Sequence, residues 1–512
     1  MPKQLNTATV VACLILSFAP TAARATLTIS SDPTSNMSCT SLACLPTAAD
    51  AVLNVADVTS RLASHNLKIA TTGAGADAGD IDIEVALSWS SARVLTLNTH
   101  ESIKIDQPVS VVGTGRLALT VTHGDLSFGP SGRVKFWDLA SSLAINGQAY
   151  TLIGNVADLA TGIASSPSAS FALADNYDAS GDAPIHGAAV TTTFLGGFEG
   201  LGNSISNLTL SCADCSSSAL VGLFGQMNGN VENLGLANIS VDAGSATAGA
   251  LAGAVLHGTL RGDFATGSLA GSGMVGGLVG TLSDGDVIRS HATVAVTTTD
   301  TATTITAGGL VGGCGLDSAG RSTISQSYAT GNITMLSTGS HIGGGLLGQF
   351  ADCAIGESFA TGAVSGEGNS SVFGGLGGWS SSTASQVSNT YATGAVSGDA
   401  SNARLGGLLS ADYGKIATSY AVGHVSGSGF AGGILQDSFT NPPDITHTVW
   451  DAQTTGQSEC IDAWDPNPSG CNGVKTRRLK SRLPAGFKPA VWALDPAKNS
   501  GYPYLINNPP PQ

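Results

Sequence analysis

The sequence predicts an all-β protein, a right-handed parallel β-helix (β-solenoid) with short helices near its N-terminal third and a non-repetitive C-terminal cap. Three observations carry this prediction: 68 glycines in 512 residues, an internal repeat between residues 216 and 440, and alternating apolar residues upstream of it. Hydrophobic residues are 42% of the chain and charged residues only 11%, which excludes the charge-rich, apolar-poor composition of disordered proteins.

Residues 1–25 are expected to be a secretory signal peptide. Lys3 precedes an apolar run from Val10 to Phe18, and residues 23–25, Ala-Arg-Ala, fit an A-x-A cleavage site that ends at Ala25. We therefore expect a secreted, extracellular or cell-surface protein. No later run reaches the ~18 apolar residues that a membrane helix needs, so we expect no transmembrane segment in the mature chain.

The segment 26–80 is interpreted as an N-terminal cap, and residues 81–215 as the first coils of the solenoid. Apolar residues alternate between 81 and 136 and recur one coil later, Leu95 matching Leu117 and Val111 matching Val134, which indicates short strands in successive coils. Helices are predicted near residues 57–65 and as an insertion near 155–163, where Asn155 is a plausible N-cap.

The strongest signal is a repeat of eight modules over residues 216–440. Each module carries an apolar residue with glycines around it, 26 to 36 residues from the next. These anchors are Leu223, Leu251, Leu278, Leu310, Leu346, Leu376, Leu408 and Ile434. Most are followed by an aromatic-Ala-Thr-Gly element, such as Tyr328 to Gly331. The modules show no helical period, so we expect coils of short strands with the anchor pointing inward and glycines at corners or close approaches.

The modules resemble the GLUG motif, which is named for its glycine-leucine core and occurs in bacterial surface proteins and filamentous-haemagglutinin-like adhesins. The resemblance covers residues 216–440. It implies an exported, non-catalytic adhesin or surface-matrix protein whose partners are cell-surface or matrix glycans or proteins. Residues downstream, among them Trp450, Trp492 and Tyr502, resemble the closing segment of such proteins.

Residues 441–512 are interpreted as a C-terminal cap, because the last coil of a solenoid exposes strand edges that need cover. This segment holds a cluster of basic residues: Lys475, Arg477, Arg478, Lys480 and Arg482. Two interpretations remain open for this basic cluster, a contact for an anionic glycan or partner, and a solvated face of the cap, which is favoured.

Eight cysteines remain after removal of the signal peptide, an even number that indicates disulfides in an exported chain. Pairing of neighbours is the simplest arrangement: Cys39 with Cys44, Cys212 with Cys215, Cys314 with Cys353, and Cys460 with Cys471. A redox motif or half a zinc site are the alternatives for Cys212-Ala-Asp-Cys215. No helix is expected after it and no second C-x-x-C exists, so a local disulfide is favoured.

Motifs for catalysis or cofactors are incomplete. His100-Glu101-Ser-Ile-Lys104 lacks the second histidine of the zinc motif H-E-x-x-H, and no triad or metal cluster suggests itself. We expect no cofactor, metal site or catalytic residue. Arg261-Gly262-Asp263 spells the tripeptide that integrins bind, but its place on a solenoid strand makes a chance occurrence the preferred interpretation.

Function divides between two classes. The mature chain has 19 basic and 36 acidic residues, a net charge of about −17, which argues against a nucleic-acid partner. An adhesin is favoured. The alternative is a polysaccharide-acting hydrolase or lyase, whose site would need carboxylates from neighbouring coils. Acidic residues are sparse within the repeats, and Asp352, Glu357, Glu367 and Asp399 do not share a module position. An acidic cluster from adjacent coils in a groove would favour the enzyme.

Overall fold

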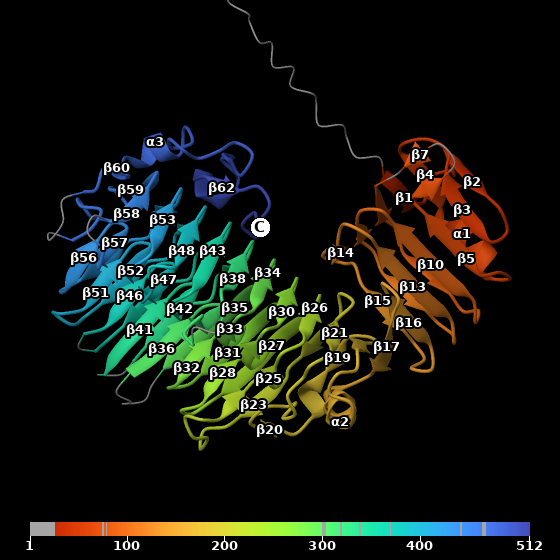
Figure 1. Cartoon of the computed structure of the whole chain (residues 1–512), viewed down its shortest axis with the longest axis horizontal. Helices are drawn as coiled ribbons and strands as arrows, with labels where there is room; N and C mark the ends of the chain where they lie inside the picture. The colour runs from red at the N-terminus through yellow and green to blue at the C-terminus, as the bar shows by residue number, and fades with distance from the viewer. Residues whose placement is uncertain are drawn as a thin grey trace, which may run out of the picture.

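The chain winds as a parallel β-solenoid, in which each strand pairs with its equivalent in the next coil (Figure 1). The structure is a computed structural model that describes residues 26–73, 76–77, 79–298, 304–317, 320–336, 339–368, 370–440, 443–462 and 467–511. Its largest sheets have 17, 17, 8 and 8 strands. The predicted signal peptide lies outside the described residues.

The repeat modules form one coil each, and their anchors lie at a corner. In one coil, β36 (Thr304–Gly308) and β37 (Val311–Cys314) flank Leu310. In the next coil, β41 (Ser340–Gly344) pairs in parallel with β36, and β42 (Leu347–Phe350) pairs in parallel with β37. All eight anchors are fully buried. The apolar residues that follow them, such as Val311 and Leu347, are buried as well, so the core includes both positions.

The glycine before an anchor is required by the close approach of coils rather than by a left-handed backbone. A Cβ on Gly309 would lie 2.0 Å from the carbonyl oxygen of Gly345 in the next coil. No real Cβ tolerates that distance, so a larger residue would push the coils apart. The same conflict recurs at Gly345, 2.1 Å from the oxygen of Gly375.

The N-terminal coils follow the predicted strands with two corrections. Leu95 faces Leu117 as expected, but Val111 faces Phe136 rather than Val134. The solenoid also begins earlier than residue 81, because β1 (Thr26–Ser30) pairs in parallel with β8 (Asp80–Ile83), and β5 (Leu67–Ala70) with β10 (Val94–Thr99). Residues 26–80 are therefore partly solenoid. Two antiparallel hairpins, β2 (Met37–Cys39) with β3 (Ala43–Pro46) and β6 (Thr72–Gly73) with β7 (Ala76–Asp77), and one helix add to it.

Two predicted helices are confirmed. Helix α1 (Val55–Leu62) begins at Asn54 and buries Val58 and Leu62. Helix α2 (Val156–Ser165) has Asn155 as its N-cap, whose side-chain oxygen accepts a hydrogen bond from the backbone N–H of Asp158 at 2.8 Å. This bond satisfies one of the free N–H groups at the helix start.

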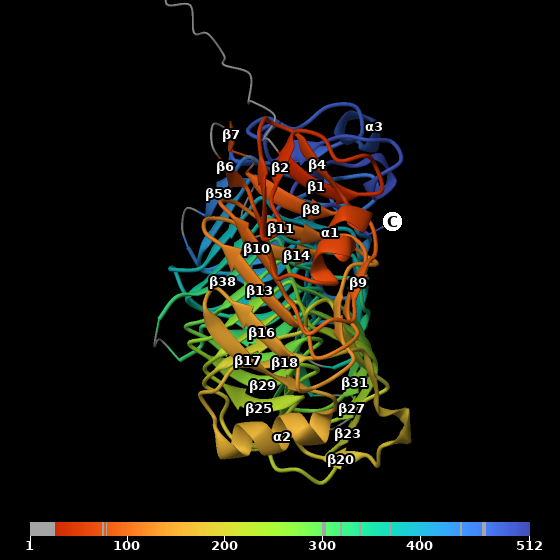
Figure 2. The same cartoon turned by 90° about the vertical axis from the view of Figure 1, so that its right-hand side faces the viewer.

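A bend divides the solenoid into two sections. Strands β16 (Ser142–Ile145) and β17 (Gln148–Ile153) pair antiparallel around Asn146 and Gly147, whose φ values of 50° and 81° are those of a tight hairpin turn. This reversal interrupts the parallel stacking, and the apolar core separates into two clusters there. Figures 1 and 2 show α2 on the outer side of the bend, while β14 (Leu126–Phe128) faces the second section on the inner side.

The C-terminal segment both extends the solenoid and folds back along it. Strands β58 (Asp444–Thr446) and β59 (Thr448–Asp451) continue the sheets, so the solenoid ends later than residue 440. The edge at the last anchor is covered by residues 459–460, whose carbonyl oxygens accept hydrogen bonds from the N–H groups of residues 433–435. No helix in the described part of the chain is long and apolar enough to cross a membrane.

Candidate binding groove at the solenoid junction

One corner of the second section holds a column of residues in the left-handed backbone conformation. Their φ values lie between 45° and 69°, one residue per coil: Asn233, Gly262, Arg289, Gln326, Glu357, Asn389, Thr418 and His447. Non-glycine residues adopt this conformation at a cost, so the corner geometry is imposed by the stacked coils on either side. The first three residues of the column border a hollow at the bend.

A column of aromatic rings runs beside this corner. Phe264, His291, Tyr328, Phe359, Tyr391 and Tyr420 occupy one register position in successive coils. Neighbouring ring centroids lie 4.6 to 5.5 Å apart and the planes differ by 4 to 15°. The column starts at Phe264, since the two preceding coils carry Gly235 and Ser204 at this position.

The C-terminal segment covers only the later rings of the aromatic column. The ring centroid of Trp492 lies 5.8 Å from that of Tyr420, and the Trp492 Nε1 donates a hydrogen bond to the side-chain oxygen of Asn389 at 3.2 Å. Further along, the amide nitrogen of Asn508 donates to the carbonyl oxygen of Glu357 at 2.9 Å. Phe264 and His291 lie beyond these contacts and remain half-buried.

The hollow at the bend, which we call the junction groove, encloses about 670 Å³. It lies between the two solenoid sections and is lined by residues 126–133, Asn176, Gly202, Ser204, Asn233, Arg261, Gly262, Phe264, Thr266, Arg289 and His291. Gly202 has a φ of 73°, and a Cβ there would lie 2.6 Å from the Gly132 carbonyl oxygen and 2.8 Å from the Phe128 ring, so this glycine allows residues 128–132 to pack against it. None of the lining residues is acidic.

Three arginines give the junction groove its charge. Asp125 bridges the sections by pairing with two of them, 3.5 Å from Arg261 Nη1 and 2.6 Å from Arg289 Nη2. Arg133 forms no ion pair with any described residue, and its Nε is buried without a hydrogen-bond partner. Burial lowers the pKa of His291 to about 4, so this ring is neutral near pH 7 and the positive charge comes from the arginines.

A pair of carboxylates from adjacent coils lies near the groove without lining it. Glu199 ends β21 (Gly197–Glu199) and faces Glu232 of β26 (Asn230–Glu232). Burial, followed by the neighbouring Glu232, raises the pKa of Glu199 to about 8, and burial also raises the pKa of Glu232. Glu199 is 3% exposed, and one of its oxygens accepts from the Asn233 side chain at 3.0 Å and the Leu201 backbone at 3.1 Å.

The tripeptide at residues 261–263 is not available as an integrin ligand. Asp263 lies in the turn between β30 (Thr259–Arg261) and β31 (Phe264–Ala270) rather than on a strand, and it is 1% exposed. Its Oδ1 accepts a hydrogen bond from the Leu234 N–H at 2.9 Å, and burial raises its pKa well above the ordinary value. The Asp263 side chain, which an integrin would need to reach, is therefore buried in the solenoid.

The five basic residues of the cap are all exposed, and none forms an ion pair with a described residue. They lie on and around α3 (Thr476–Leu479). Lys475, Arg478 and Arg482 line a second pocket of about 1140 Å³ at the end of the solenoid. Lys480 instead lies with its Nζ 4.4 Å from the centre of the Tyr502 ring, so the cluster is split between two environments.

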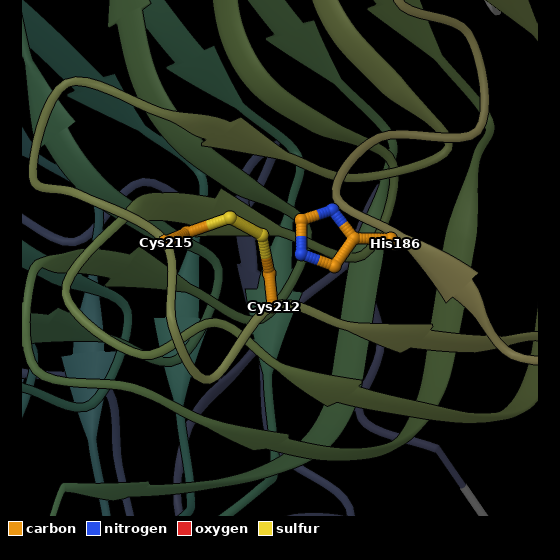
Figure 3. Close-up of side chains that lie close together, drawn as sticks. All are labelled: His186, Cys212 and Cys215. Atoms are coloured by element: carbon orange, nitrogen blue, oxygen red, sulfur yellow. A yellow bond between two sulfur atoms is a disulfide. The ribbon is translucent and has the colours of Figure 1, made fainter.

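All four predicted disulfides are present in the structure. Figure 3 shows His186 beside the Cys212–Cys215 disulfide. Among the described residues, these three form the one group of three or more His, Cys, Asp or Glu side chains whose possible metal-ligand atoms all lie within 4.8 Å of one another. Both sulfurs are in the disulfide, and His186 Nε2 lies 3.0 Å from Asp214 Oδ1. The local disulfide that the spacing favoured is confirmed, and it leaves no thiolate to bind zinc.

Comparisons with known proteins give the chain a resemblance but no family. No protein-family model matches it, and no curated protein matches its sequence. Among solved structures, a putative immunoglobulin A1 protease from Bacteroides ovatus has 18% identity and a TM-score of 0.40, with 70% of this chain and 93% of that chain covered. A second structure, described as IgA1 protease, has 20% identity and a TM-score of 0.36 over 52% of this chain and 21% of that one. The chain is similar to these proteins in part of its fold, and its architecture is established by its own strand pairing.

Proposed function

We propose that this protein is an exported, non-catalytic adhesin or surface-matrix protein that binds glycans in the junction groove. The observation that carries the proposal is the groove's lining, which combines aromatic rings, asparagine amides and three arginines with no acidic residue. Ligand sites of this kind combine apolar and aromatic surface with a few polar groups that fix orientation. The sequence resemblance to GLUG-bearing surface proteins and the predicted signal peptide support the same assignment.

The basic cap is proposed as a second, weaker contact with anionic partners. Lys475, Arg478 and Arg482 line one pocket, and their positive charge contrasts with the acidic balance of the whole chain. Attraction of this kind between exposed charges is screened by salt.

A polysaccharide-acting enzyme is the second candidate, and the Glu199–Glu232 pair favours it. Hydrolases use two carboxylates, one of them protonated at neutral pH. The pair is less suited to this role because Glu199 is 3% exposed and neither carboxylate lines the junction groove.

The two candidates are separated by binding to a glycan array and to cells, measured together with the release of sugar fragments. Binding without fragment release, weakened by changes in the groove, is the expected result. Fragment release that is lost in both Glu199→Gln and Glu232→Gln would establish the enzyme instead.

A further inference from the structure

The aromatic column ends at the junction groove, where its first ring, Phe264, is one of the lining side chains. The Phe264 ring leans over Gly235 of the preceding coil, where a Cβ would lie 2.4 Å from its Cζ, so the glycine makes room for this ring. Phe264, Ser204 and Phe128 all line the groove, which brings an aromatic wall and a small polar floor together. The C–H face of a sugar ring buries apolar surface when it packs on an aromatic ring.

The arginines around the groove are only partly balanced by carboxylates. Asp125 is the acidic partner of both Arg261 and Arg289, and its side chain is 38% exposed. Arg133 adds a third charge and brings a buried Nε without a partner. The charges of Arg261 and Arg289 also act on Glu232, so at most two carboxylates face three guanidinium groups, and at least one positive charge remains in excess.

We infer that the junction groove binds a carboxylated sugar ring of an acidic polysaccharide, with the ring on Phe264 and the carboxylate on the arginines. The inference rests on the proposed glycan-binding function and names its ligand class. A planar guanidinium donates two parallel hydrogen bonds to a carboxylate, which fixes the position of the sugar as well as its charge. A neutral glycan would offer the arginines hydroxyl oxygens as acceptors but no negative charge. A volume of about 670 Å³ lies within the range of sites that enclose small ligands.

Asp125 competes with the ligand in this arrangement. Its oxygens lie 3.5 Å from Arg261 Nη1 and 2.6 Å from Arg289 Nη2, where the ligand carboxylate would bind. Removing the charge of Asp125 therefore frees both arginines, and Asp125→Asn is expected to bind an acidic sugar more tightly. An unfolded variant cannot produce this gain, which separates the prediction from a loss of structure.

The test measures binding of polygalacturonate to the mature protein by calorimetry, with its methyl ester as the uncharged probe and dextran sulfate as the sulfated one. We expect wild type to bind polygalacturonate and to lose at least about tenfold in affinity for the ester. Arg133→Gln and Arg289→Gln are expected to weaken binding about tenfold, and Asp125→Asn to strengthen it severalfold. Arg116→Gln is the matched control, because Arg116 is exposed on β13 (Arg116–Val121) and does not line the groove.

Aromatic stacking is tested by Phe264→Ala, with Phe430→Ala as the control, since Phe430 is 46% exposed and outside the groove. Only the first change is expected to weaken binding of polygalacturonate. Two outcomes would overturn the carboxylated-sugar inference while leaving glycan binding intact. One is equal affinity for polygalacturonate and its methyl ester. The other is tighter binding of dextran sulfate than of polygalacturonate, with an affinity that Phe264→Ala does not change. Binding to none of these probes or to any glycan on an array would overturn the proposed function itself.

Discussion

Replacing Glu199 with glutamine is expected to remove a pH-dependent loss of stability. The pKa of this carboxyl is about 8 in the folded chain and 4.5 in an ordinary environment, because burial disfavours its charged form. Below pH 4.5 the folded and unfolded chains both hold the proton, and the stabilising contribution is fully present. As the pH rises toward 8, only the unfolded chain releases the proton, so the folded state loses stability.

The magnitude follows from the size of the shift. One pKa unit corresponds to 1.36 kcal/mol, so the difference between 4.5 and about 8 amounts to about 5 kcal/mol above pH 8 and about 3 kcal/mol at pH 7. Glutamine keeps an oxygen that accepts from the Asn233 side chain and the Leu201 N–H, but it carries no titratable proton. Glu199→Gln is therefore expected to match wild type at pH 4 and to exceed its stability increasingly toward pH 9.

Urea unfolding of wild type and Glu199→Gln across pH 4 to 9 measures this difference. Glu84→Gln is the matched control, because Glu84 is exposed and its replacement changes the same charge at the surface. Parallel pH profiles for wild type and Glu199→Gln would refute the reasoning, since they would mean that Glu199 titrates alike in the folded and unfolded chains.

Three further predictions concern the solenoid itself. Leu346→Ala is expected to cost about 2–5 kcal/mol in urea unfolding because the side chain is fully buried, whereas Leu336→Ala, at a residue 52% exposed, should change stability by less than ~0.5 kcal/mol. Alanine at both Cys314 and Cys353 should lower the stability by about 4 kcal/mol, from the entropy of opening a loop of 39 residues, and an unchanged melting temperature would contradict this. Thr418→Gly should raise the stability by about 1 kcal/mol, because a β-branched residue is strained at a φ of 47°, and a lower stability would show that the Thr418 side chain is needed.

The coil architecture could be predicted from the sequence because it depends on local patterns, the repeat spacing and the alternation of apolar residues. The anchors recur every 26 to 36 residues, and the alternation at Leu95 and Leu117 gives the correct strand partners. Register within a coil is less local: Val111 pairs with Phe136 because the turn before β15 (Val134–Phe136) adds two residues to that coil. The predicted limits of the solenoid, residues 81 and 440, were wrong. Strands that pair with the coils also lie before residue 81 and after residue 440, where the local sequence does not carry the repeat pattern.

The junction groove could not be predicted, because it depends on a bend and on contacts between residues far apart in the chain. Asp125 and Arg289 are 164 residues apart, and nothing in the local sequence of either indicates the other. One local signal was available: Asn146-Gly147 between two runs of alternating apolar residues is typical of a hairpin, and a hairpin ends parallel stacking. A similar separation along the chain, 151 residues, explains why the contact of Asn508 with Glu357, in the column of left-handed residues, could not be predicted.

Binding of one acidic polysaccharide, followed in parallel with release of its fragments, tests the central claim most directly. The mature protein and Arg133→Gln are compared on immobilised polygalacturonate, with Arg116→Gln as the control. The account predicts that wild type and Arg116→Gln retain the polysaccharide, that Arg133→Gln retains about tenfold less, and that no protein releases fragments. Fragment release by wild type, or retention that Arg133→Gln does not change, would contradict a non-catalytic binding protein that uses the junction groove.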